Sequence, residues 1–134
     1  MATTAYGLMA GREKALAKYR TMSVETASPG ELVLMLYNES LRAMKDASAA
    51  MERNDIGASS NSLLKAQDIV MELRSSLNPR AGMEVAANLD KMYEFVGGRL
   101  IEANVKKSQE PLMDAMKVMG SLRDGWQEVI GKHV

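Results

Sequence analysis

The chain has 134 residues, and its 17 basic and 17 acidic side chains leave no formal net charge. Nucleic-acid-binding proteins carry a basic excess because contacts to phosphates dominate their affinity, so this balance argues against a nucleic-acid partner and against an anionic membrane surface. The length fits a single domain. The absence of cysteine, and of any apolar run near the roughly 20 residues that span a bilayer, predicts a cytoplasmic protein without disulfides and without membrane insertion.

Methionine is unusually frequent, with 12 residues against 4 tyrosines, 1 tryptophan and 1 phenylalanine. Its flexible side chain re-packs easily and is common at adaptable binding surfaces. The same side chain also fills gaps in a helical core that is poor in aromatic residues. Both interpretations stay open on the sequence alone, and they do not exclude each other.

The first long helix has the clearest start in the sequence. Ser28 is placed as its N-cap, Pro29 fits the first helical position, and Glu31 stands three residues after the cap, where it closes a capping box. We expect this helix to run from about Pro29 to Arg53. The consecutive apolar residues at 32–37 point all around its axis, so it must be covered on more than one side.

Three further long helices are predicted from their caps and breakers. Asp55 is placed as the cap of the second helix. Proline disfavours helix in the residue before it, so we expect this helix to end before Pro79. Ser108 is placed as the cap of the fourth helix. The expected ranges of the second, third and fourth helices are about 56–77, 83–106 and 109–131.

Helices of similar length with short connections favour antiparallel neighbours, so the sequence predicts an all-α, antiparallel up-down four-helix bundle over residues 25–134. We expect residues 1–24 to form a docking segment, helical or extended, that packs on this bundle. The period of the apolar residues predicts the core. The main core positions are Leu36, Tyr37, Ala43, Met44, Ile56, Leu63, Val70, Leu77, Val85, Leu89, Met92, Val96, Leu100, Leu112, Ala115, Met119, Leu122, Trp126 and Val129.

When the residues of each helix are placed around its axis at 100° per position, several apolar residues fall outside the side that faces the core. They suggest a second apolar surface that runs along the bundle and binds a foreign helix. The alternative is that the N-terminal segment covers this surface permanently. Asn104 fits either a satisfied amide or an anchor for a guest backbone. The candidates for partner binding are Leu34, Leu41, Leu64, Met71, Tyr93, Ile101 and Asn104, and those for the N-terminal cover are Tyr6, Leu16 and Tyr19.

Catalytic and metal-binding patterns are missing from the sequence. The single histidine, His133, stands next to the end of the sequence, and no glutamate lies three residues before it. The Glu-x-x-His pairs of di-metal helical bundles are therefore absent, and no serine in the body of the chain has a histidine base. No glycine-rich phosphate loop is present. We expect no enzyme activity, no metal and no cofactor.

A set of segments carries a resemblance to a known family. These segments are Tyr19 with Val24, residues 26–37 (TASPGELVLMLY), residues 65–69 (KAQDI), residues 72–77 (ELRSSL), Asn88-Leu89, Tyr93, residues 100–105 (LIEANV) and Trp126. From Tyr19 onward the chain resembles the flagellar secretion chaperone FliS family. It departs from the family's usual pattern at Glu39, where a glycine is common, and at Leu16, where an aromatic residue is common.

The resemblance implies a cytosolic export chaperone. Such a protein binds the disordered C-terminal segment of flagellin in an apolar groove, prevents its premature polymerisation and delivers it to the flagellar type III export apparatus. The resemblance also implies the export gate as a further partner and an N-terminal segment that covers part of the groove. We expect a monomer or weak dimer. The alternative that the residues leave open is a non-catalytic regulatory or structural helical bundle that self-associates through the same apolar strip.

Overall fold

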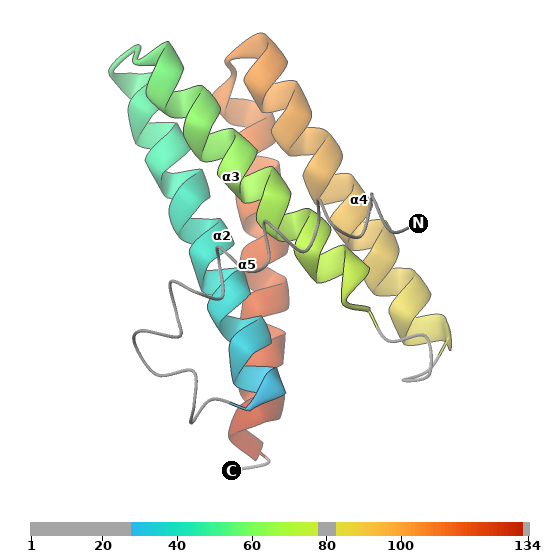
Figure 1. Ribbon diagram of the computed structural model, residues 1–134. Coiled ribbons are helices and arrows are strands. Elements are labelled where there is room, and N and C mark those ends of the chain that lie inside the picture. The colour runs from blue at the N-terminus through green and yellow to red at the C-terminus, as the bar shows by residue number, and fades with distance from the viewer. Residues whose placement is uncertain (1–27, 78–82, 133–134) are drawn as a thin grey trace, which may run out of the picture.

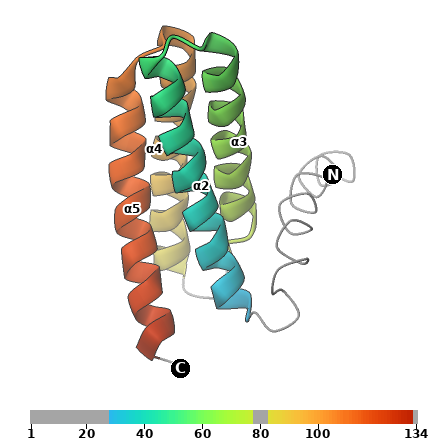
Figure 2. The ribbon, with the colours of Figure 1, turned by 90° about the vertical axis from the view of Figure 1, so that its left-hand side faces the viewer.

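The computed structural model describes residues 28–77 and 83–132. Within these ranges the chain forms four α-helices, and each helix packs beside the next one in the chain, with the last returning to the first. Figures 1 and 2 show that neighbouring helices run in opposite directions. The predicted all-α antiparallel four-helix bundle is confirmed. The helices are α2 (Pro29–Glu52), α3 (Ile56–Ser75), α4 (Met83–Lys106) and α5 (Gln109–Lys132).

The helices begin where local capping groups place them. The Ser28 hydroxyl accepts a hydrogen bond from the Glu31 N–H at 3.2 Å, and the Asp55 carboxylate accepts one from the Ala58 N–H at 3.1 Å. Each bond satisfies a backbone donor that the first helical turn leaves unpaired. The predicted caps Ser28 and Asp55 are confirmed, and Ser108 as the cap of α5 stays a prediction. The second helix ends at Ser75, two residues before its expected end, and the predicted boundary at residue 24 lies outside the described residues.

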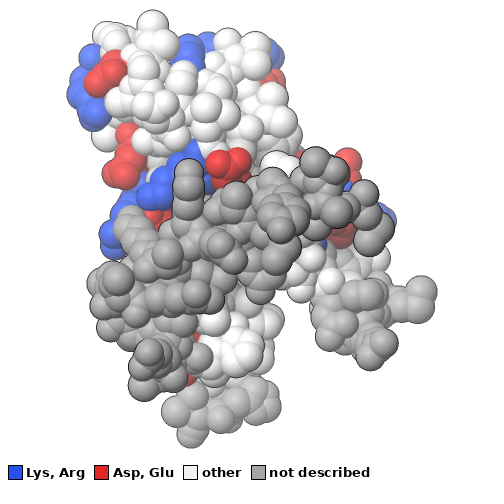
Figure 3. All heavy atoms as spheres, viewed as in Figure 1, with Lys and Arg blue, Asp and Glu red and all other residues white. Residues whose placement is uncertain are grey.

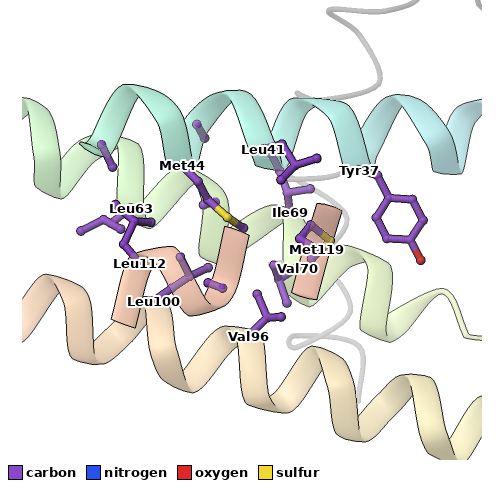
Figure 4. Packing of buried hydrophobic residues seen from close by; sticks show 14 of the residues in the cluster. Tyr37, Leu41, Met44, Leu63, Ile69, Val70, Val96, Leu100, Leu112 and Met119 are labelled. Carbon is purple, nitrogen blue, oxygen red and sulfur yellow. The ribbon is translucent and has the colours of Figure 1, made fainter. Parts of the chain in front are cut away.

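A continuous apolar core fills the centre of the bundle (Figure 4). Met44 from α2, Leu63 from α3 and Leu100 from α4 are fully buried there. The core prediction is confirmed for most positions, but four of the expected core residues are exposed. These are Ile56, Val85, Met92 and Val129.

Three of the four exposed positions share a physical reason, whereas Ile56 lies at the other end of the bundle, where α3 begins. Ile56 begins α3, Val85 and Met92 lie in the first half of α4, and Val129 lies in the last turns of α5. Figure 1 shows that the α2–α5 pair and the α3–α4 pair diverge toward the end where α4 begins and α5 finishes. A correct helical period therefore does not bury a side chain where the opposite helices have moved apart.

Polar links between α2 and α5 complete the bundle. Trp126 is half-buried against the core, and its Nε1–H donates to the Gly30 carbonyl at 2.8 Å. At the other end of the same pair, Gln109 Nε2 donates to the Ser48 carbonyl at 2.9 Å. These bonds satisfy polar groups that packing takes out of water. They hold α2 and α5 together independently of the face described next.

Candidate functional site

One face of the bundle combines exposed apolar side chains with polar groups at both ends. Residues spaced by three or four positions share one side of a helix, so α3 and α4 each present a row to this face. We call it the α3–α4 face. Its residues are Ser60, Leu64, Gln67, Met71 and Arg74 on α3, and Asp90, Glu94, Gly97, Ile101 and Asn104 on α4.

Hydrogen bonds fix how the two rows lie against each other. The Ser60 hydroxyl donates to Asn104 Oδ1 at 3.2 Å at one end of the face. At the other end, Arg74 Nε and Nη2 donate to the two carboxylate oxygens of Asp90 at 2.5 and 3.2 Å. Ser60 and Arg74 lie 14 positions apart on α3, which is a rise of about 21 Å. The face is therefore long enough to accept about four turns of a guest helix.

The middle of the face is apolar and open. Leu64, Met71 and Ile101 are 50%, 53% and 54% exposed, and Gln67 and Gly97 between them are half-buried. The ionisable residue nearest the middle of the face is Asp68, an exposed residue of α3 four positions after Leu64 and three before Met71. Single exposed apolar residues are ordinary on protein surfaces, but aligned ones on neighbouring helices are typical of partner-binding sites.

At one end of the face, Arg74, Asp90 and Glu94 form an ionic cluster. The hydrogen bond from Arg74 lowers the pKa of the Asp90 carboxyl, and the positive charge of Arg74 acts in the same direction. Glu94 lies 3.4 Å from the same guanidinium. Because these groups are at the surface, the cluster contributes little to the free energy of unfolding. Asp90 is therefore ionised at neutral pH, and both of its carboxylate oxygens accept from Arg74.

Four of the predicted partner-binding residues come together on the α3–α4 face: Leu64, Met71, Ile101 and Asn104. The amide of Asn104 accepts hydrogen bonds from Ser60 and Lys107, as a satisfied amide would. Its role in binding a guest, like that of the other three, stays a prediction.

The remaining candidates lie elsewhere. Leu41 and Tyr93 are buried, and Figure 4 shows Leu41 beside Ile69 in the core. Leu34 is half-buried on α2, outside the pair of helices that forms the face. Tyr6, Leu16 and Tyr19 lie outside the described residues, so their predicted covering role is untested.

At the polar ends of the face, Asn104 was among the predicted residues, whereas the charged residues were not. Lys107 follows α4, and its ammonium donates to the Ser60 hydroxyl at 2.6 Å and to Asn104 Oδ1. Arg74 and Glu94 were missed in the same way. The bonds of Arg74 to Asp90 and Glu94, and of Lys107 to Ser60, join positions 16 to 47 residues apart in the chain. No local sequence signal marks such pairs.

A buried tyrosine pair explains why Tyr93 is part of the core. The hydroxyl groups of Tyr37 and Tyr93 share a hydrogen bond between α2 and α4, and their ring centroids lie 6.4 Å apart. Burial raises the pKa of the Tyr37 hydroxyl, although the bond to Tyr93 lowers it in part. Burial also raises the pKa of the Tyr93 hydroxyl, and its bond to Tyr37 adds to the rise. The folded state therefore keeps both phenols protonated.

The free energy of unfolding is expected to fall above about pH 10. An unfolded tyrosine loses its proton near pH 10, whereas the folded pair retains its protons to higher pH, so alkali favours the unfolded state. Below that pH the contribution of the pair is constant. Urea unfolding from pH 8 to pH 11 measures this dependence. Tyr37→Phe with Tyr93→Phe is the control, and an equally steep decline in this double variant would assign the effect to other groups.

The described ranges contain neither a metal-binding cluster nor a membrane-spanning helix. No cluster of three or more His, Asp and Glu side chains that could hold a metal ion occurs in residues 28–77 and 83–132. None of the four described helices has the length and hydropathy to cross a membrane. Figure 3 shows basic and acidic groups interspersed on the visible described surface, so no patch of a single sign forms in this view.

Comparison with known proteins identifies a single group of relatives. The family model described as "Flagellar protein FliS" matches residues 12–133. The flagellar secretion chaperone FliS of Bacillus subtilis is 38% identical over 112 residues, which cover 84% of this chain and 83% of that protein. FliSB of Pseudomonas aeruginosa is 32% identical over 87% of this chain and 95% of that protein. FliS of Vibrio cholerae is 30% identical over 85% of this chain and 87% of that protein.

Proposed function

The chain belongs to the FliS family of flagellar secretion chaperones, and on that premise we propose that its α3–α4 face binds the disordered C-terminal segment of flagellin. A secretion chaperone acts by binding its cargo and not by catalysis. The observation that carries the proposal is the line of Leu64, Met71 and Ile101, half-exposed between two polar ends. A guest with an amphipathic sequence gains helix when it lays its apolar side on such a strip.

The physics of the proposed complex suits a cargo that must later be released. A disordered guest loses conformational freedom when it binds, and this ordering costs about 2 to 5 kcal/mol of the gross interaction energy. The affinity is reduced by that amount even when the apolar contact is extensive. Methionine in the contact, as at Met71, adapts its shape to the guest.

The cellular role follows from this binding. We propose that the protein holds newly made flagellin in the cytoplasm, keeps its C-terminal segment from polymerising early and delivers it to the export apparatus. The N-terminal segment, through Tyr6, Leu16 and Tyr19, is proposed to cover the binding surface before the guest arrives. An alternative for the same apolar strip is self-association of two bundles.

Calorimetry tests the proposal directly. We expect isothermal titration of the full chain with a synthetic peptide of the flagellin C-terminal segment to give saturable heat with one peptide per chain. No heat at roughly tens of micromolar, with the chain well folded, would contradict the proposal. Light scattering at several concentrations tests the alternative, because a stable dimer that ignores the peptide would support self-association.

Two adjacent glycines supply a matched pair of variants for the same titration. Gly97 lies in the face between Glu94 and Ile101, whereas Gly98 is turned away by about 100°. Apart from the adjacent residues and the backbone of α4 itself, no heavy atom of the described residues lies within 4 Å of a Cβ added at either position. Gly97→Gln and Gly98→Gln should therefore both fold, each gaining up to about 1 kcal/mol of helix propensity.

The two variants are expected to differ in binding. In Gly97→Gln the new side chain would occupy the space that the guest approaches and place an amide on the apolar strip, so the Kd should rise by about tenfold or more. The Gly98→Gln variant should bind within about twofold of the parent. Equal binding by both variants would place the contact elsewhere.

A further inference from the structure

The two ends of the α3–α4 face carry opposite charge. At one end the Lys107 ammonium lies beside Ser60 and Asn104. The charged residues nearby form ion pairs: Arg53 pairs with Asp55 at 3.8 Å, and Lys106 pairs with Glu102 at 2.8 Å. The charges within each pair cancel, so Lys107 contributes the remaining positive charge.

At the other end, Arg74 faces both Asp90 and Glu94, so this cluster of three side chains carries one negative charge. The two ends are about 21 Å apart along α3, and the exposed Asp68 borders the strip between them. The backbone dipoles of α3 and α4 oppose each other because the helices are antiparallel, so the side chains decide the polarity of the face.

Lys107 occupies an unfavourable backbone conformation. Its φ is 49°, in the left-handed region that favours glycine at the position after a helix. The residue at the corresponding position after α2 is Asn54, with φ 57°, and asparagine tolerates this region far better than lysine does. A lysine at this position is strained, and such strain is typical of residues whose side chain is needed for function.

The Lys107 side chain has capacity for one more bond. An ammonium group carries three donors, and the described structure supplies two acceptors, the Ser60 hydroxyl and the Asn104 amide oxygen. The third N–H can donate to an acceptor outside the bundle. A helix offers such acceptors at its C-terminal end, where the last carbonyls lack intrahelical partners and carry partial negative charge.

On the basis of the proposed function, we infer that the α3–α4 face binds its guest helix in one direction, and that Lys107 selects this direction. The C-terminal end of the guest lies at Lys107, and its positive N-terminal end lies at Asp90 and Glu94. The guest thus runs parallel to α4 and antiparallel to α3. Reversal would place the guest carbonyls against the acidic end and the guest N–H groups against the ammonium.

Neighbouring lysines supply the matched variants for the first test. Lys107→Gln and Lys106→Gln each remove one positive charge, but Lys106 pairs with Glu102 on the outer side of α4. In the peptide titration, Lys107→Gln should raise Kd about fivefold, with a smaller effect at high salt, whereas Lys106→Gln stays within about twofold. Equal effects of the two variants would contradict a role for Lys107.

The direction itself can be measured because the chain has no cysteine. A single cysteine at exposed Asn61 carries a nitroxide near the Lys107 end, and one at exposed Ala87 carries it near the acidic end. We expect the label at position 87 to broaden the NMR signals of the N-terminal half of an isotope-labelled flagellin peptide, and the label at position 61 those of the C-terminal half.

The possible outcomes separate this inference from the proposed function. The opposite pattern, or equal broadening of both halves, would overturn the direction while leaving the binding of flagellin intact. A peptide that shows no binding to the parent chain by calorimetry would overturn the proposed function, and the direction with it.

Discussion

Met71→Asp is expected to weaken binding of the flagellin peptide by about 100-fold or more. Met71 is 53% exposed in the middle of the α3–α4 face, so a guest would bury the rest of its side chain. The variant loses that apolar contact, worth about 1 to 2 kcal/mol, and places a charge against the guest, which costs several kcal/mol more. Isothermal titration measures the change in Kd.

Met113 supplies the control for this experiment. It is 55% exposed on α5, which does not contribute to the face, and Met113→Asp makes the same chemical change. Both variants should keep helicity and melting temperature close to the parent, because both positions are already open to water. Equal losses of affinity in the two variants would show that the α3–α4 face is not the binding surface.

Leu63→Ala and Leu64→Ala should affect different properties of the protein. Leu63 is 0% exposed and lies among the core side chains, whereas its neighbour Leu64 is 50% exposed. Removing the Leu63 side chain leaves a cavity that the surrounding helices fill only in part, so we expect a loss of about 2 to 5 kcal/mol in the free energy of unfolding. Leu64→Ala should cost less than about 0.5 kcal/mol. Urea unfolding compares the two variants.

The two leucine variants are expected to rank in the opposite order when peptide affinity is measured in place of stability. Leu64→Ala should raise the Kd of the peptide about fivefold, because the guest loses an apolar contact. The folded fraction of Leu63→Ala should bind within about twofold of the parent. If Leu64→Ala destabilised the bundle as strongly as Leu63→Ala, Leu64 would belong to the core and the apolar strip would lose its main element.

These predictions describe a molecule in which stability and binding depend on different sides of the same helices. The core side of α3 carries Leu63, Val70 and Leu73, all buried. The side that meets α4 at the surface carries Leu64 and Met71, which the fold leaves open. A chaperone benefits from this separation, because the guest can bind and leave without disturbing the packing of the bundle.

Local sequence signals were sufficient to predict the helices, the antiparallel bundle and most of the core. Helix starts are local events: Ser28 and Asp55 satisfy backbone donors three residues away, so their neighbours in the chain suffice to place them. The period of apolar residues likewise records which side of each helix faces inward. The exposed face was found in part by the same reasoning, through Leu64, Met71 and Ile101.

The spacing between the helices along the bundle, and the residues that meet there, could be seen only in the folded protein. The divergence of the two helix pairs leaves Val85 and Val129 in water despite their correct period, and Tyr93 is buried where it meets Tyr37 of α2 across the bundle. The polar ends of the face arise from the register between α3 and α4, which joins Ser60 to Asn104 and Arg74 to Asp90. A helical period gives the direction of a side chain around its own axis, whereas a contact also requires the position of the other helix along and beside that axis.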